Sequence, residues 1–381
     1  MLMADETPTA VARRDALWER HRARWRQLVE QHPLQYVFFE VTRRCNLACV
    51  YCGSSCTPKT SRQELSIEQW IGIARQIASD FDARKIMIAV TGGEPLIKEG
   101  VDDLFAVLHE LGFGYGMVTN GYFLDAERAR KLVAAGMGSI SISMDAPTDV
   151  NDKLRGKGAS EKVARAVDAL RAAGFAGKLE IISTITRPVV PLLPAMREHV
   201  ASLRVPFWRV APVMPIGRAA NRPDLVPDAA DVRTILEFVR AGRRDGFVPA
   251  PEFSEEGFLG NRFEGCVRPY LAQCRAGITI AGIQSDGRIG ACPELGDAFI
   301  QGDIRTERLK HVWETRYQTL RDRSWTKKGR CARCSQYDNC HGGAMHLYPA
   351  PDGDLLRCLY WMAKEVEEAH AGGDGRNPPQ A

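Results

Sequence analysis

Residues 36–52 read YVFFEVTRRCNLACVYC, and this stretch decides how the rest of the chain is interpreted. The first seven residues are rich in the aromatic and β-branched side chains that favour a strand. Three cysteines, Cys45, Cys49 and Cys52, then follow within one eight-residue loop. We therefore expect a group of thiols directly after the first strand of the fold.

Five further β-rich runs follow along the chain, at residues 85–91, 115–120, 139–145, 179–186 and 207–214. Helix-patterned stretches, such as residues 67–81 and 101–112, fall between these runs. Strands that alternate with helices predict a parallel sheet wound into a TIM-like barrel. Because the pattern stops near Met214, we expect an α/β fold with a partial (β/α)6 barrel instead of the eight-unit form.

The same pattern divides the chain into five parts. Residues 1–34 are expected to form a helical N-terminal extension, with Leu17, Trp18, Trp25 and Leu28 as apolar anchors. The barrel takes residues 35–225, a linker helix takes residues 226–262, and a cysteine-rich domain of hairpins and loops takes residues 263–362. Residues 363–381 are polar and rich in glycine and proline, which predicts a disordered tail.

Composition and charge exclude several classes of protein. The 381 residues are 45% apolar, and their net charge of +4 is too small to indicate nucleic acid or a membrane surface as a partner. The first eleven residues lack the apolar core of a secretion signal, and no segment approaches the roughly 20 apolar residues that span a bilayer. We expect a soluble, cytoplasmic protein without membrane insertion.

The eleven cysteines fall into two groups. Cys45, Cys49, Cys52 and Cys56 stand near the start, and the other seven lie between Cys266 and Cys358. Thiols in the cytosol are kept reduced, so metal binding explains these cysteines better than disulfides do. The distribution predicts two metal-binding regions.

The first region combines a CX3CX2C loop with a glycine motif after the next predicted strand. A cubane iron–sulfur cluster normally has four cysteine ligands, so three thiolates leave one iron free to bind and activate a ligand. A zinc loop completed by Cys56 or by a distant histidine is the alternative. Gly92 and Gly93 let the backbone approach a ligand closely, and Glu94 and Pro95 fix how the strand ends.

These two motifs together resemble those of the radical SAM superfamily, over residues 35–218. The resemblance implies that Cys45, Cys49 and Cys52 hold a [4Fe-4S] cluster whose open iron is chelated by S-adenosylmethionine (SAM). It also implies that four further residues contact SAM. Gly92, Gly93 and Glu94 would contact its methionine amine, and Tyr51 would lie beside its adenine.

Ser143, Asp145 and Arg155 resemble the S-x-D…R pattern by which sulfatase-maturating members of the superfamily hold the ribose and the carboxylate of SAM. A planar guanidinium suits the carboxylate because it can bind both oxygens. Ala146 departs from the family's usual glycine. The resemblance implies that reductive cleavage of SAM gives a 5′-deoxyadenosyl radical, which abstracts a hydrogen atom from the substrate.

The second region resembles the SPASM extension of peptide-modifying radical SAM enzymes, which carries two auxiliary iron–sulfur clusters. The resemblance implies that Cys331, Cys334, Cys340 and Cys358 bind one auxiliary cluster. The other would have Cys274, Cys292 and Cys266. The family's seventh cysteine is replaced here by Ala344.

The missing thiolate leaves three possibilities open, namely an iron that binds substrate, a ligand such as His341 or His346, and a smaller [2Fe-2S] cluster. Surface histidines without a ligand role are the simpler interpretation of His341 and His346, and zinc is the alternative metal for the whole cysteine set. Six short stretches also resemble a subgroup of SPASM maturases found beside small lipoproteins or peptides. They are PIGRA, EGFLG, CRAGI, ACPEL, FIQGDI and VWETRY.

We therefore expect a radical SAM enzyme that modifies a peptide or small protein and receives electrons from a donor such as flavodoxin or ferredoxin. A radical SAM enzyme for a small molecule, such as a tetrapyrrole or a sugar, is the second hypothesis. A zinc-stabilised binding or scaffold protein is the third.

Overall fold

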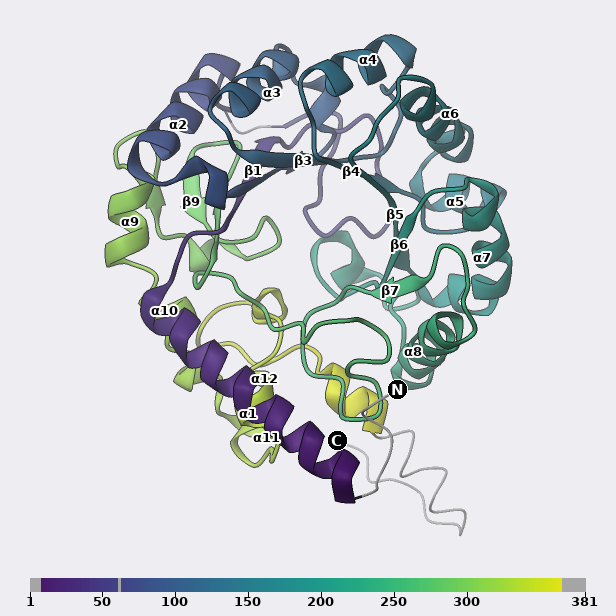
Figure 1. Ribbon diagram of the computed structural model, residues 1–381, viewed down its shortest axis with the longest axis vertical. Coiled ribbons are helices and arrows are strands. Elements are labelled where there is room, and N and C mark those ends of the chain that lie inside the picture. The colour runs from purple at the N-terminus through teal and green to yellow at the C-terminus, as the bar shows by residue number, and fades with distance from the viewer. Residues whose placement is uncertain (1–7, 61–62, 365–381) are drawn as a thin grey trace.

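A computed structural model describes residues 8–60 and 63–364. Its centre is a ten-stranded sheet with the order β10-β9-β8-β1-β2-β3-β4-β5-β6-β7, and Figure 1 shows this sheet curving around a central opening. Neighbouring strands from β1 to β7 are parallel, and β8 is parallel to β1 on its other side. The strands are β1 (Tyr36–Thr42), β2 (Met87–Gly92), β3 (Gly114–Thr119), β4 (Ser139–Ser143), β5 (Lys178–Ile185), β6 (Phe207–Pro212), β7 (Pro251–Phe253), β8 (Ile280–Ile283), β9 (Arg288–Gly290) and β10 (Gly302–Asp303).

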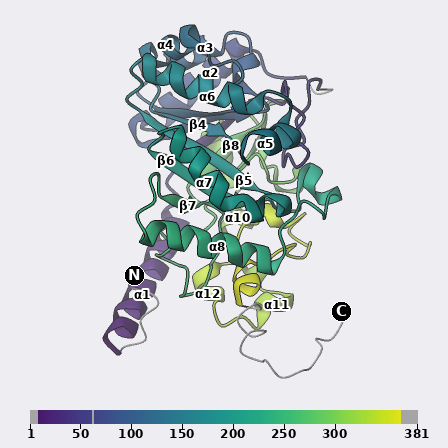
Figure 2. The same ribbon diagram turned by 90° about the vertical axis from the view of Figure 1, so that its right-hand side faces the viewer.

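Helices cover the outside of the parallel strands, and shorter helices follow in the C-terminal region (Figures 1 and 2). The long ones are α1 (Pro8–Gln31), α2 (Ile67–Asp80), α3 (Val101–Glu110), α4 (Ala126–Ala134), α5 (Thr148–Arg155), α6 (Ala159–Ala172), α7 (Leu193–Ser202) and α8 (Ala229–Arg244). The short ones are α9 (Leu309–Thr315), α10 (Gln318–Arg321), α11 (Gly329–Ala332) and α12 (Tyr337–Cys340). The mixed α/β barrel class expected from the sequence is confirmed.

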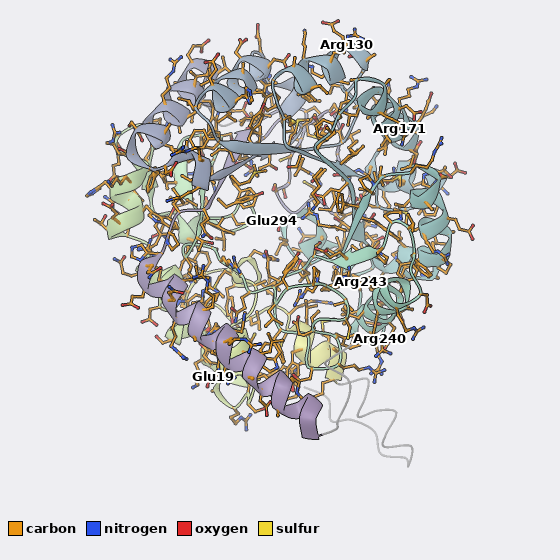
Figure 3. The ribbon with its side chains drawn as sticks, in the orientation of Figure 1. Glu19, Arg130, Arg171, Arg240, Arg243 and Glu294 are labelled. Atoms are coloured by element: carbon orange, nitrogen blue, oxygen red, sulfur yellow. The ribbon has the colours of Figure 1, made fainter. Side chains whose placement is uncertain are left out.

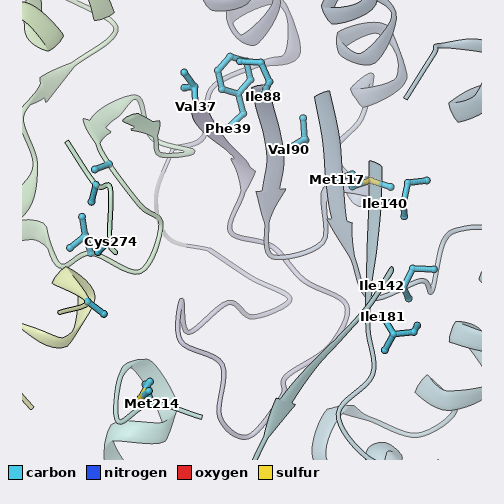
Figure 4. Packing of buried hydrophobic residues seen from close by; sticks show 14 of the residues in the cluster. Val37, Phe39, Ile88, Val90, Met117, Ile140, Ile142, Ile181, Met214 and Cys274 are labelled. Atoms are coloured by element: carbon cyan, nitrogen blue, oxygen red, sulfur yellow. The ribbon is translucent and has the colours of Figure 1, made fainter. Parts of the chain in front are cut away.

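Alternation of side chains along the strands separates an apolar outer face from a mixed inner face. In β1, Val37 and Phe39 are fully buried, and Figure 4 shows them directed away from the barrel interior with Ile88 and Val90 of β2. Tyr36 and Phe38 of the same strand line the interior instead. Because successive side chains of a strand point to opposite faces, one pattern supplies both the core and the lining of the site.

Helix α2 illustrates how the outer layer forms. Ser66 caps its first turn in a reciprocal capping box with Gln69, which satisfies backbone donors that have no partner inside the helix. Trp70, Ile73 and Ile77 follow at helical spacing and are buried. The capping box sets where α2 begins, and the apolar stripe sets which side faces the sheet.

The sheet is longer than the six strands that the sequence predicts. β7 pairs in parallel with β6, although residues 226–262 were expected to contain only a linker helix, and α8 precedes it there. β8, from the cysteine-rich region, pairs with β1. Both strands are only three or four residues long, so neither gives the extended alternation that marks a strand in the sequence.

Helix α1 lies across the C-terminal region, as both ribbon views show (Figures 1 and 2). Trp18 packs edge to face on Phe258, with 5.2 Å between ring centroids, and its indole donates a hydrogen bond to Asn261. Trp25 stacks on His341 at 4.7 Å. The predicted anchors Trp18, Trp25 and Leu28 are buried, so this helix belongs to the packed structure.

Most of the tail predicted to be disordered, residues 363–381, lies outside the described residues. Among residues 8–60 and 63–364, no helix combines the length and the apolar character needed to cross a bilayer.

A fully buried ion pair holds the turn after β7. The guanidinium of Arg268 donates to the Glu264 carboxylate at 2.5 and 3.1 Å, and also to the carbonyls of Glu255 and Gly257, each at 2.6 Å. The side chains of Arg268 and Glu264 are 0% and 2% exposed. Removing one partner leaves the other charge buried without compensation, which is costly.

We predict that Arg268→Met lowers the free energy of unfolding by about 3–5 kcal/mol, because it leaves the Glu264 carboxylate unpaired. Urea denaturation followed by circular dichroism measures the change. Arg171→Met is the control, because Arg171 forms an exposed pair with Asp168, and pairs of that kind contribute about 0–1 kcal/mol. Equal losses in the two variants would contradict the prediction.

Candidate active site

The three predicted cluster cysteines stand in one loop after the carboxyl end of β1. Cys45 is buried, and Cys49 and Cys52 are partly buried. The backbone amide of Leu47 donates to Sγ of Cys45 at 3.4 Å, and the side-chain amide of Asn120 donates to the same sulfur at 3.8 Å. Hydrogen bonds to sulfur are among the features that tune iron–sulfur clusters, so this donor set fits such a cluster.

The thiols of the loop have different pKa values. Burial raises the pKa of Cys45 to about 11 and also raises the pKa of Cys49. The pKa of Cys52 falls to about 6, because the thiol of Cys56 donates a hydrogen bond to its sulfur. Cys56, which was named from the sequence only as a possible ligand of the alternative zinc loop, is therefore a hydrogen-bond partner of Cys52. Whether the three predicted cysteines are the ligands stays a prediction.

A residue that sequence reasoning gave no role, Arg218, holds the cysteine loop in place. Its side chain donates to the carbonyls of Cys49 at 2.7 Å and Cys56 at 2.8 Å, and its backbone amide donates to the carbonyl of Cys52 at 3.0 Å. Gly217 before it has a φ of +54°, and a Cβ there would overlap the backbone of Cys52 and Gly53. The PIGRA stretch was noted in the sequence, but its spacing gives no sign of this contact.

Gly92 and Gly93 approach the backbone that leads into the cysteine loop. A Cβ on Gly92 would overlap the carbonyl of Thr42, and one on Gly93 would overlap the carbonyl of Arg44 and lie 3.0 Å from Cβ of Cys45. The amide of Gly93 donates to the carbonyl of Thr42 at 2.7 Å. These glycines are therefore required by the packing of β2 against the end of β1, whatever else they contact.

Glu94 is fully buried and binds the end of β3. Its carboxylate accepts hydrogen bonds from the hydroxyl of Thr119 at 2.7 Å, the amide of Asn120 at 2.8 Å and the amide of Leu96 at 3.2 Å. Burial raises its pKa, and these hydrogen bonds oppose the rise. Glu94 thus joins the carboxyl ends of β2 and β3, and its predicted contact with SAM stays a prediction.

Tyr51, Asp145 and Arg155 form a connected group beside the cysteine loop. Nη1 of Arg155 lies 2.5 Å from Oδ2 of Asp145 and 3.3 Å from the Tyr51 hydroxyl, which itself donates to Asp145. Burial and the Asp145 charge raise the pKa of Tyr51. Burial works against the charge of Arg155, but Asp145, Tyr51 and Cys49 raise its pKa overall. Three predicted SAM contacts therefore meet, and Ser143 ends β4 just before Asp145.

A cavity of about 400 Å³ occupies the interior of the barrel and reaches the cysteine loop. This size is within the usual range for ligand pockets. Its walls carry inner-face residues of the strands, Tyr51 and Cys52 of the loop, and a group from the C-terminal half: Glu255, Glu256, Cys292, Glu294 and His346. Figure 3 labels Glu294 near the central opening. Its Oε1 lies 2.8 Å from the point that a Cβ would occupy if Gly53 carried a side chain.

The four cysteines predicted for the second auxiliary cluster line one pocket. They are Cys331, Cys334, Cys340 and Cys358, with aromatic and glycine residues around them. Burial raises the pKa of Cys340 to about 12 and that of Cys358 to about 11. The structure therefore brings the complete predicted set together.

The cysteines predicted for the first auxiliary cluster are not gathered in the same way. The carboxylate of Glu256 lies close enough to Cys274 and to Cys292 for its charge to help raise the pKa of each thiol. Burial is the main cause that raises the pKa of Cys292, and the negative charge of Glu294 is the second. Cys266 is not among the residues that line either this cavity or the four-cysteine pocket. The structure thus places carboxylates near two of the three predicted thiols.

The two histidines named from the sequence have separate environments, and one expectation about them is wrong. His346 is only 7% exposed, so it is not a surface histidine. His341 stacks on Trp25 of α1, and burial lowers its pKa to about 4. Only His346 faces the central cavity. The Gly-rich sequence around both residues hid this difference, because long-range packing causes it.

Comparison with protein families gives two matches. The radical SAM superfamily matches residues 39–196, and the SPASM iron–sulfur cluster-binding domain matches residues 274–335. Mycofactocin maturase MftC of Mycobacterium tuberculosis is 31% identical over 319 residues, which cover 81% of this chain and 77% of the relative. AdoMet-dependent heme synthase of Methanosarcina barkeri is 26% identical over 350 residues, covering 86% of this chain and 97% of the relative.

Solved structures share the fold at low sequence identity. A structure described as native anSMEcpe with bound AdoMet has a TM-score of 0.69 and 18% identity, covering 89% of this chain and 97% of that chain. Streptococcus suis SuiB bound to precursor peptide SuiA has a TM-score of 0.67 and 17% identity, covering 87% and 78%. The family matches and the relative at 31% identity show that the chain belongs to the radical SAM superfamily and carries a SPASM domain.

Proposed function

We propose that this enzyme modifies a peptide or small protein by radical chemistry in the central cavity. As a radical SAM enzyme, it uses a [4Fe-4S] cluster with SAM, and its SPASM domain implies auxiliary iron–sulfur clusters. The observation that carries the proposal is the cavity of about 400 Å³ that joins the cysteine loop to Cys292 of the SPASM region. A substrate there would lie between the two metal-binding regions.

When bound, and with one electron from an external donor, the cluster and SAM would supply reductive cleavage of the S–C5′ bond of SAM to methionine and a 5′-deoxyadenosyl radical. The ligands would be Cys45, Cys49 and Cys52. Arg155 would bind the SAM carboxylate while Asp145 fixes the position of its guanidinium. Tyr51 would contact the adenine, and the inner faces of the strands would exclude water from the substrate.

The peptide part of the proposal is supported by relatives of this chain. A curated relative is named as a mycofactocin maturase, and two neighbouring structures are described with peptides, Cp18Cys in anSMEcpe and SuiA in SuiB. The second candidate is a tetrapyrrole substrate, because heme synthases align over as much as 97% of their length. MftC has the higher identity of the two, which favours the peptide.

The electron donor and the cellular location are also parts of this proposal. An opening of about 410 Å³ also borders the cysteine loop, and its lining includes Ala48 and Val50 of that loop and the exposed residues Lys153 and Lys157. Lysines beside a buried redox centre suit an acidic partner. We therefore retain a flavodoxin or ferredoxin as donor, in the cytoplasm.

We predict that anaerobic incubation with SAM and dithionite yields 5′-deoxyadenosine with the wild type and none with Cys49→Ala, which lacks one thiolate ligand. Chromatography with mass detection measures the product. Cys56→Ala is the comparison variant and should keep its iron and some activity, because it removes a hydrogen bond to Cys52 but no ligand. Loss of the metal in Cys56→Ala, or zinc without acid-labile sulfide in the wild type, would contradict the cluster assignment.

We predict that Arg155→Met raises the Kd for SAM about 10- to 100-fold, because it removes a charge-assisted bond to the carboxylate. It should also destabilise the protein, since Asp145 is left buried and unpaired. The double variant Arg155→Met/Asp145→Asn should recover stability without recovering SAM affinity. Anaerobic equilibrium dialysis and thermal unfolding measure the two effects, and recovery of both in the double variant would refute a direct role for Arg155.

We predict that a short peptide encoded beside the gene changes mass when it is incubated with the reduced enzyme and SAM. The change should be absent with Cys49→Ala and should require the full precursor with its leader. Mass spectrometry of the peptide provides the measurement. Conversion of iron-coproporphyrin III, with every candidate peptide unchanged, would replace the peptide proposal by the tetrapyrrole one.

A further inference from the structure

Three side chains in the wall of the central cavity converge from distant parts of the chain. Glu255 and Glu256 begin one residue after the end of β7, and His346 belongs to a 3-10 helix at Met345–Leu347 in the SPASM region. One ligand atom from each of the three lies within 4.8 Å of the other two. This spacing suits ligands of one metal ion, since metal–oxygen and metal–nitrogen bonds of about 2.0–2.2 Å place neighbouring ligand atoms close together.

The buried imidazole of His346 has a charged neighbour, Glu255, but no hydrogen bond at Nε2 within the described part of the chain. Its side chain is 5% exposed, and Nε2 has no hydrogen-bond partner among the described residues. Nε2 lies 3.4 Å from Oε1 of Glu255 without the geometry of a hydrogen bond. A buried polar atom left unpaired is costly, and a metal ion at this nitrogen would satisfy it.

The buried guanidinium of Arg268 is bonded to the carboxylate of Glu264 and to backbone carbonyls beside Glu256, and no hydrogen bond joins it to the Glu255 or Glu256 carboxylate. Arg268 binds the Glu264 carboxylate and donates to the carbonyls of Glu255 and Gly257, on either side of Glu256. The guanidinium therefore fixes the turn that presents Glu255 and Glu256. Outer contacts of this kind hold metal ligands in place before the ion binds.

The geometry points to a site for one divalent first-row transition metal ion, such as Fe²⁺, Mn²⁺ or Zn²⁺, held by Glu255, Glu256 and His346. Imidazole favours zinc and iron, and carboxylates favour manganese, so the mixed set selects this class over Ca²⁺ or Mg²⁺. Because the site faces the cavity, remaining coordination positions are available to a carbonyl or carboxylate of the substrate. Only this substrate-positioning role rests on the proposed function; metal binding does not.

The proposed site differs from the first auxiliary cluster in the number of protein ligands that bind each metal atom. An iron of a cubane takes one protein ligand, whereas three ligand atoms converge here. Cys274 and Cys292 are not among these three ligands, so the two assignments use different side chains. The two assignments therefore differ in what happens to iron and sulfide when His346 is replaced.

The test uses the full chain with its clusters reconstituted anaerobically and adventitious metal removed by EDTA. Mn²⁺ is titrated in the absence of SAM and peptide, and the electron paramagnetic resonance signal of free Mn²⁺ gives the Kd and stoichiometry. We expect one tight equivalent in the wild type, with a nitrogen coupling from bound imidazole in pulsed spectra. Zn²⁺ should displace this Mn²⁺.

His346→Gln and Glu255→Gln should each raise the Kd for Mn²⁺ at least about 100-fold, and His346→Gln should abolish the nitrogen coupling. Glu252→Gln, which changes a glutamate of β7 outside the site, should bind Mn²⁺ as the wild type does. Iron and acid-labile sulfide should remain unchanged in all three variants, which also reports that the variants are folded.

Two results would overturn the inference. One is the absence of a tight Mn²⁺ equivalent in the wild type, which needs no variant. The other is the loss of the iron and sulfide of one cluster in His346→Gln, which would show that the imidazole is a cluster ligand instead. Neither result bears on 5′-deoxyadenosine formation, so a failure here is distinguishable from a failure of the proposed function.

Discussion

The close approach of β2 to the end of β1 is the constraint on which the site depends. Gly92 and Gly93 lie where any Cβ would overlap the backbone of Thr42 and Arg44, and that backbone runs directly into Cys45. The backbones of these two chain segments are therefore in direct contact. The direction in which the cysteine loop leaves the sheet follows from this contact, and Arg218 secures the loop from the other side.

The parts of the fold that could be predicted from the sequence are those with a long local signal. Strand runs such as YVFFEVT and the helix at residues 67–81 gave the parallel barrel, because burial of one face imposes a visible period. β7 and β8 were missed, since three or four residues are too few to show a period. Their place in the sheet is set by pairing with β6 and β1.

The residues of the candidate site also fall into those that a local motif predicts and those that it does not. Tyr51, Asp145 and Arg155 were named from a motif, and the structure joins them by hydrogen bonds. Arg218, Glu255 and Glu256 were not found, because their partners stand tens to more than a hundred residues away in the chain and no local spacing marks them. The zinc scaffold considered from the sequence is set aside by the family match, which identifies an enzyme.

The position of β1 in the middle of the sheet has a consequence for synthesis of the protein on the ribosome. β1 pairs with β2 on one side and with β8 on the other, and β8 begins only at Ile280. While the intervening residues are being translated, one edge of β1 has no strand beside it, and such edges favour association with other chains. The nascent enzyme thus exposes the strand next to its cysteine loop until late in translation. Chaperones would be most useful during this period of exposure.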